Sequence, residues 1–115
     1  MIDATNGDRA ANGLAGLCTN ALLNGMAQRW ANWMAQNDSL THQNLNALIG
    51  DSPFSAMGEN ILDGPGTMST TQMEAAWMAS PDHRANILQA RFRVAGVGIA
   101  FGADGRVWAV VDFGG

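Results

Sequence analysis

Two apolar runs near the end of the chain place the strongest constraint on its fold. Residues 94–101 and 107–113 are rich in β-branched and aromatic side chains, which is typical of β-strands. Between them, Gly102-Ala103-Asp104-Gly105 has the composition of a hairpin loop, so we expect the two strands to pair antiparallel. Both runs are apolar on both faces, and a sheet that contains them therefore needs a covering layer on each side.

Helices are predicted in the earlier part of the chain. Asn20 is a good N-cap for a helix over residues 20–36. Apolar residues recur there at spacings of three and four, so we expect an amphipathic helix that buries its tryptophans and methionines. Shorter helices are predicted over residues 3–11 and 80–89, where Pro81 suits the first helical position. The recurring apolar residues of the long helix are Leu22, Leu23, Met26, Ala27, Trp30, Trp33 and Met34.

The order of these elements defines the fold class. Residues 58–62 look extended and lead into a turn at residues 63–66, which contains two glycines and a proline. Helices come first and the paired strands come last, which indicates an α+β fold rather than alternating βαβ units. We therefore predict a three-layer α-β-α sandwich with a central antiparallel sheet, formed by residues 1–115 as a single domain.

The composition excludes several classes of protein. An apolar fraction of 47% rules out intrinsic disorder, and no apolar run is long enough to span a bilayer. All six cations are arginines without a cluster and the net charge is −4, so the basic footprint of a nucleic-acid-binding protein is absent. The single cysteine, Cys18, excludes an internal disulfide framework, and the lack of a base beside it predicts a small buried side chain.

Two histidines and two glutamates are the main candidates for chemistry. His42 follows the long predicted helix in a polar loop, and His83 lies in the first turn of a helix, where the dipole favours a neutral imidazole. Glu59 lies 17 residues after His42 and 24 before His83, on an apolar stretch where a carboxylate needs a partner. This spacing matches no local metal motif. Two interpretations stay open: a metal or catalytic cluster, or a capping His, a solvated His and a structural carboxylate.

The remaining glutamate and the serine next to the second histidine have simpler interpretations. Thr71-Gln72-Met73-Glu74 has the form of a capping box, in which the Glu74 side chain bonds back to the backbone N–H of Thr71. Ser80 suits a helix cap better than a catalytic role, because the chain has no Gly-x-Ser-x-Gly turn.

Two segments resemble the signature motifs of a known family. Residues 77–88, WMASPDHRANIL, and residues 58–61, GENI, are similar to the two central motifs of bacterial CAP domains. CAP domains form the superfamily of cysteine-rich secretory proteins, insect venom allergens and plant pathogenesis-related proteins. Further similar positions occur in the expected order over nearly the whole chain: Asn6, Arg9, Gly13, residues 39–42, Val97, Gly98 and residues 107–114.

The resemblance implies a fold, a location and a cleft. Its α-β-α sandwich agrees with the fold predicted above. Members are exported, so we expect a secreted domain whose leader has been removed, since no basic and apolar leader follows Met1. By position, the cleft of this chain would hold His42, Glu59, Ser80 and His83. Ser80 stands where eukaryotic members have a second glutamate, and Glu74 is the nearest candidate to replace that glutamate.

The resemblance also implies ligands. Members bind divalent cations such as zinc through the histidine pair, which here is His42 and His83. Some members bind sterols or fatty acids in apolar grooves. In this chain such a groove would need exposed residues such as Phe54, Met57 or Met68.

Three functions are therefore compared. The first is a secreted binding module whose cleft holds a zinc ion, with an open position for a ligand or protein partner. The second is a metal-dependent hydrolase or peptidase in which Glu59 acts as general base on a metal-bound water. The third is a sterol- or fatty-acid-binding protein. We favour binding over catalysis because the chain shows no oxyanion motif and no activated nucleophile. We expect a monomer without a transmembrane segment.

Overall fold

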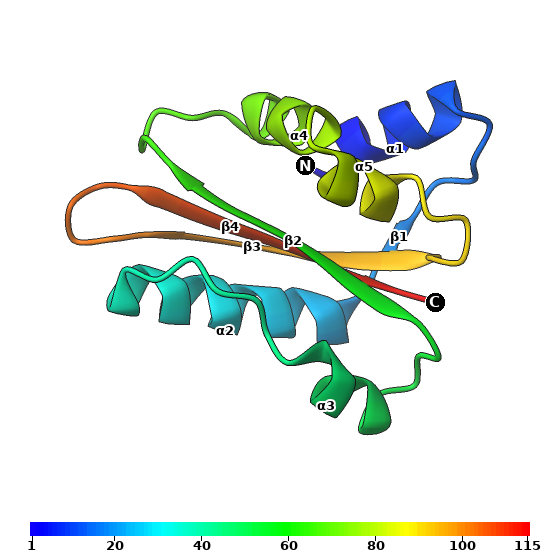
Figure 1. The fold of residues 1–115 in the computed structure, drawn as a ribbon, viewed down its shortest axis with the longest axis horizontal. Coiled ribbons are helices and arrows are strands. Elements are labelled where there is room, and N and C mark those ends of the chain that lie inside the picture. The colour runs from blue at the N-terminus through cyan, green and yellow to red at the C-terminus, as the bar shows by residue number, and fades with distance from the viewer.

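The computed structural model describes residues 1–115 and has a four-stranded sheet between two layers of helices (Figure 1). One layer contains α1 (Ile2–Ala11), α4 (Thr70–Met78) and α5 (Pro81–Ile87), and the other contains α2 (Ala21–Asn37) and α3 (Leu45–Gly50). The strands are β1 (Cys18–Thr19), β2 (Met57–Gly64), β3 (Val94–Phe101) and β4 (Val107–Gly114). The predicted three-layer α+β sandwich is confirmed.

The strands lie in the order β1-β3-β4-β2, so β4 has a long neighbour on each side. It pairs antiparallel with β3 and with β2, and the predicted hairpin forms with residues 102–106 as its loop. The sheet is not wholly antiparallel as predicted, because β1 pairs parallel with β3 through Cys18 and Thr19. A strand of two residues has no periodicity that a sequence pattern could reveal.

The long helix α2 begins and packs as its sequence indicates. The Asn20 side chain accepts a hydrogen bond from the backbone N–H of Leu23 at 3.1 Å and caps the helix as predicted. The helix lies directly on β3, because a Cβ atom added at Gly96 would meet backbone atoms of Leu23 at 2.1 Å. A methyl group at that position would push the two elements apart, so the glycine permits the close contact.

The start of α4 differs from the prediction. Ser69 is the N-cap, and Ser69 and Gln72 form the reciprocal capping box, with hydrogen bonds of 3.1 and 2.8 Å. The predicted box at Thr71 and Glu74 is therefore wrong. Glu74 therefore lies within the helix rather than in its capping turn, and it is buried against α1 with 3% exposure.

The core consists of two apolar clusters, one on each side of the sheet. The cluster under α1, α4 and α5 is built around Trp77, Phe92 and Phe113, and the two phenylalanine rings stack at 5.3 Å. The cluster under α2 joins Ala27, Ala31 and Met34 of the helix to Ile61, Trp108 and Val110 of the sheet. Both faces of the sheet are therefore covered, as the apolar strands require.

Three predicted core positions lie at the surface instead. Leu22 is exposed, and Trp33 is 39% exposed and stacks on Trp30 with ring centroids 4.5 Å apart. Cys18 is also exposed, contrary to the prediction of a buried thiol, because it lies on the short outer strand β1. Helical spacing selects one side of a helix, but the width of the buried stripe depends on what packs against it.

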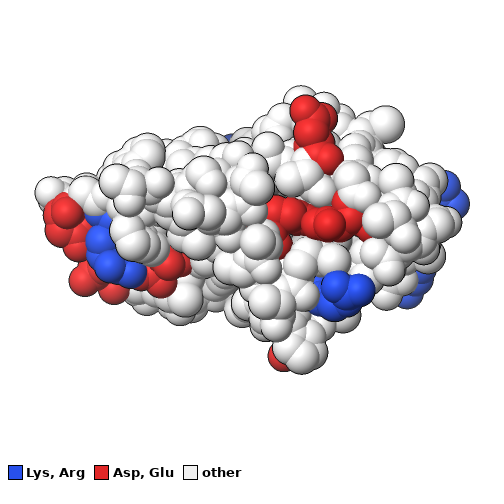
Figure 2. Space-filling model, turned by 90° about the horizontal axis from the view of Figure 1, so that it is seen from above, with Lys and Arg blue, Asp and Glu red and all other residues white.

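Charged groups are sparse and dispersed. On the face shown in Figure 2 the arginines are scattered and form no continuous basic patch. Near the hairpin end of the sheet, the Arg106 guanidinium donates two hydrogen bonds to one oxygen of the Asp63 carboxylate, at 3.1 and 2.7 Å. This exposed pair contributes little to stability because solvent screens it.

Candidate functional site

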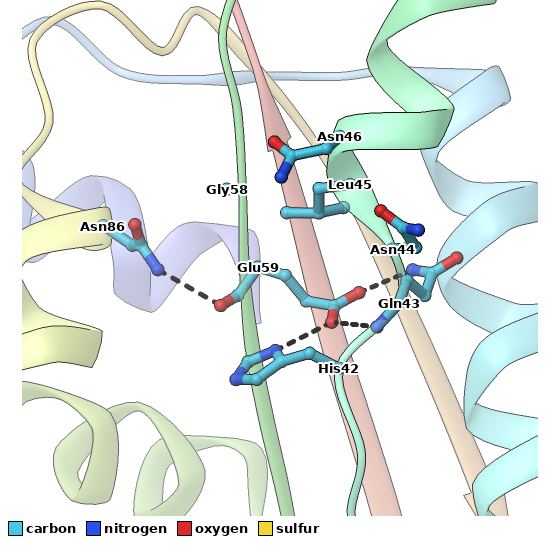
Figure 3. Close-up of a pocket in the computed structure, with 8 residues that line it drawn as sticks. All are labelled: His42, Gln43, Asn44, Leu45, Asn46, Gly58, Glu59 and Asn86. Carbon is cyan, nitrogen blue, oxygen red and sulfur yellow. Dashed lines mark hydrogen bonds and ion pairs between the residues drawn. The ribbon is translucent and has the colours of Figure 1, made fainter.

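An open polar pocket of about 390 Å³ lies beside the edge strand β2 (Figure 3). It is lined by the loop before α3, by the start of α3, by β2 and by α5, with Leu45 as its one apolar residue. The lining residues are His42, Gln43, Asn44, Leu45, Asn46, Gly58, Glu59 and Asn86. The pocket therefore offers mainly amide, imidazole and carboxylate groups to a ligand.

The carboxylate of Glu59 is the centre of the hydrogen bonds in this pocket. Its side chain is fully buried, with 0% exposure. One oxygen, Oε1, accepts a hydrogen bond from the backbone N–H of Gln43 at 3.0 Å and lies 2.9 Å from Nδ1 of His42. The other, Oε2, accepts from the side-chain amide of Gln43. The predicted need for a partner is thus met by three donors, all from the loop before α3.

The imidazole of His42 is 57% exposed and is held at one nitrogen only. A carboxylate oxygen accepts hydrogen bonds and does not donate them, so Nδ1 of His42 carries the proton in its contact with Glu59. The second ring nitrogen, Nε2, points away from Glu59 (Figure 3). In the neutral ring this Nε2 atom has a free lone pair, which is the form that binds a metal ion.

Ser80 and His83 lie at the start of α5, the helix that also carries the pocket residue Asn86, but they do not line the pocket. Burial lowers the pKa of His83, the charge on His42 lowers it further, and Asp82 opposes both effects. His83 is therefore neutral at pH 7, as its helix position predicts, and it lies within the electrostatic reach of His42. Ser80 is the N-cap of α5 without a side-chain hydrogen bond from the helix.

The structure brings His42 and Glu59 into contact, while His83 stays outside their hydrogen bonds. No group of three or more His, Cys, Asp or Glu side chains is arranged to hold a metal ion. The carboxylate of Glu59 is engaged with the ring of His42 and with Gln43, so among the imidazole and carboxylate groups of the pocket Nε2 of His42 is the atom without a partner in the protein.

Asp112 is a site residue that the sequence analysis missed. It lies opposite Glu59 in the β2–β4 register and is completely buried. Its Oδ2 atom accepts a hydrogen bond from the side chain of Gln43 at 2.9 Å, and its Oδ1 atom has no partner. Burial and then the neighbouring carboxylate of Glu59 raise the pKa of Asp112 to about 9. The sequence held one signal for this residue: Asp112 is an acidic residue inside a predicted strand whose other residues are apolar on both faces.

Glu74 does not replace a second acid in this pocket. It lies on α4, in the helical layer on the other side of the sheet, and accepts a hydrogen bond from the hydroxyl of Thr5 at 2.8 Å. Burial, followed by a hydrogen bond with Asp8, raises the pKa of Glu74 to about 7 against the lowering effect of the hydrogen bond from Thr5. Glu74 therefore joins α4 to α1.

Comparison with protein families identifies this fold. The model of the cysteine-rich secretory protein family, CAP, matches residues 2–113. The chain belongs to the CAP family. A search of curated proteins found no match.

Solved CAP structures share the whole fold at low sequence identity. An outer surface protein from Borrelia burgdorferi is 20% identical with a TM-score of 0.85, and the alignment covers 98% of this chain and 87% of that protein. An extracellular SCP-domain protein from Bacillus anthracis is 23% identical with a TM-score of 0.78, over 98% of this chain and 38% of that one. A cysteine-rich secretory protein from Staphylococcus aureus is 20% identical with a TM-score of 0.75, over 99% and 36%. In the last two, this chain corresponds to just over a third of the relative.

No helix of this CAP domain combines the length and the apolar character that a membrane span requires.

Proposed function

We propose that this CAP domain is an extracellular binding module whose polar pocket takes up a divalent cation, with zinc preferred. The observation that carries the proposal is the contact between His42 Nδ1 and the buried carboxylate of Glu59 at 2.9 Å. A carboxylate behind a histidine fixes the ring and makes its other nitrogen a better metal ligand. The extracellular location is inferred from the names of the Bacillus and Staphylococcus relatives.

The two imidazoles fit a weakly held, accessible zinc ion. His42 offers a free Nε2, and burial lowers the pKa of His83 and so favours the neutral form that ligates metal. Zinc in proteins prefers four ligands. Two positions are then left for water, for a ligand or for a group of a partner protein, which suits reversible binding better than a structural metal.

Binding fits the pocket better than hydrolysis does. A general base needs access to the water that it deprotonates, whereas the Glu59 side chain is fully buried and accepts three hydrogen bonds. We therefore assign Glu59 the role of orienting His42.

Binding a cation also fits better than carrying a sterol or fatty acid. The pocket has one apolar lining residue, Leu45. Phe54, Met57 and Met68 are each half-buried and line none of the pockets on the surface.

Zinc titration by calorimetry tests the proposal. The protein should carry Cys18→Ser, because the exposed thiol of Cys18 is itself a zinc ligand. We expect one-to-one binding at pH 7.5 that weakens at least tenfold at pH 5.5, because protons compete for the imidazoles. His42→Ala should abolish binding and His83→Ala should weaken it at least tenfold.

Asn46→Ala is the matched control for this titration. Asn46 lines the same pocket and its side chain makes no hydrogen bond within the protein, so the substitution should leave zinc affinity unchanged. His42 and His83 are the only histidines of the chain. Unchanged zinc affinity in the His42→Ala protein would therefore overturn the proposal.

A further inference from the structure

Two carboxyl groups lie side by side beneath the pocket. Glu59 of β2 and Asp112 of β4 are directly opposite each other in the sheet, and both are buried. Opposite residues of an antiparallel pair have Cβ atoms about 5 Å apart on the same face. Two buried carboxylates this close cannot both be charged, so one of them keeps a proton at neutral pH.

The hydrogen bonds indicate which of the two keeps the proton. Glu59 accepts from three donors, namely the His42 ring and the backbone and side-chain amides of Gln43, which together stabilise a negative charge. Asp112 accepts from one donor, the same Gln43 amide, and its Oδ1 atom is buried without a partner. The charge therefore belongs on Glu59 and the proton on Asp112, in agreement with the raised pKa of Asp112.

The side-chain amide of Gln43 joins the two carboxyl groups. Its Nε2 atom donates one hydrogen to Glu59 and the other to Oδ2 of Asp112. Both hydrogens of the amide are then used. The proton of neutral Asp112 adds an O–H donor beside the Glu59 carboxylate, directly opposite it in the register of the sheet.

We propose that Asp112 is a positioning residue that, as a neutral carboxylic acid together with Gln43, holds the Glu59 carboxylate in the orientation that receives Nδ1–H of His42. The consequence for cation binding rests on the proposed function: the tautomer of His42, and hence its free Nε2, is set by a residue that His42 does not touch. Asp112 acts through Glu59 and contacts no ligand.

The test compares Asp112→Asn and Asp112→Ala in metal-free protein. Asparagine keeps an acceptor for Gln43 and a donor for Glu59, whereas alanine removes both. Nitrogen-15 NMR of the His42 ring at pH 7.5 reports the tautomer directly. We expect the wild type and Asp112→Asn to hold the proton on Nδ1, and Asp112→Ala to give the mixture of tautomers typical of a free imidazole. Zinc affinity should stay within threefold in Asp112→Asn and fall at least tenfold in Asp112→Ala.

Val110→Ala is the matched control, because Val110 lies two residues earlier on the same strand and face, is fully buried and has no polar group. It creates a cavity without removing any hydrogen bond to Glu59 or Gln43, so the His42 tautomer should not change. An unchanged tautomer in a folded Asp112→Ala protein overturns the inference, and so does loss of the Nδ1–H form in Val110→Ala.

The tautomer measurement also separates this inference from the proposed function. If the wild type binds no zinc while Asp112→Ala alone changes the tautomer, the proposed function fails and the positioning role stands. If zinc binds and the tautomer does not change in Asp112→Ala, the proposed function stands and the positioning role fails. Should Asp112→Ala fail to fold, Gln43→Ala replaces it: the loss of the bridging amide must then weaken the Nδ1–H form, and an unchanged tautomer overturns the inference.

Discussion

The protein buries a carboxyl group with a raised pKa on each side of its sheet, and the surroundings of the two groups differ. Glu74 lies between α4 and α1, where its neighbours are Thr5 and Asp8. Asp112 lies under α2, where Gln43 and Glu59 connect it to the exposed ring of His42. Both groups have an oxygen without a partner.

The difference between these two groups shows what a perturbed pKa can and cannot indicate. Burial is the largest cause of the raised pKa in both carboxyl groups. The pKa of Glu74 is raised although this residue lies in a closed contact between two helices, so a raised pKa does not by itself mark a functional site. Only Asp112 belongs to a chain of hydrogen bonds that ends at an open pocket. The connection to an accessible side chain, rather than the size of the shift, therefore marks the functional candidate.

The largest expected effect comes from removing each carboxyl in turn. Asp112→Ala and Glu74→Ala should each lower the free energy of unfolding by about 2–3 kcal/mol, because each leaves buried polar partners without a bond and a small cavity. Zinc affinity should fall in Asp112→Ala alone. Denaturant unfolding and zinc calorimetry on the same samples check this. An equal loss of zinc affinity in Glu74→Ala would show that the two groups do not differ in the way described.

The pH dependence of stability should separate the two groups next. A carboxyl whose pKa is raised by folding keeps a proton that the unfolded chain releases, so stability is lost as pH rises between the two pKa values. For Glu74 this window runs from 4.5 to about 7, and for Asp112 it runs from 3.8 to about 9. Each group contributes a slope of at most about 1.4 kcal/mol per pH unit.

Neutral amides remove these slopes and so identify them. Glu74→Gln should remove part of the loss of stability that the wild type shows between pH 4.5 and 7. Asp112→Asn should remove the loss of stability between pH 7 and 9, which Glu74→Gln should leave in place. Thermal unfolding measured from pH 4 to 9.5 compares each variant with the wild type. If Asp112→Asn and the wild type run parallel above pH 7, then Asp112 does not hold the proton.

The smallest effect concerns the helix start that buries Glu74. Ser69→Ala should cost about 1 kcal/mol, because it removes the hydroxyl that accepts from the backbone N–H of Gln72. Thr71→Ala should change stability by less than about 0.5 kcal/mol, because Thr71 is an exposed residue inside the helix. Chemical denaturation of the two variants decides between the two capping boxes, and a larger loss in Thr71→Ala would contradict the observed start of α4.

Features that depend on residues close together along the chain were predictable from the sequence. The β3–β4 hairpin, the Asn20 cap of α2 and the helix at Pro81 follow from periodicity and local hydrogen bonding. The family motifs also indicated His42, Glu59 and His83 as a group, and the contact between the first two is present. The capping box of α4 was predicted at Thr71 and Glu74 and is formed instead by Ser69 and Gln72, a pair that satisfies the same local rule two residues earlier.

What only the tertiary structure decided is the environment of each polar side chain. Asp112 and Glu59 are 53 positions apart (112 − 59) and meet because β2 and β4 pair in one register. A shift of one residue in that register would turn Glu59 to the opposite face and separate the two carboxyls. Local rules give each element its type, but burial and partners depend on how distant elements pack, and the chemistry of this pocket depends on those two quantities.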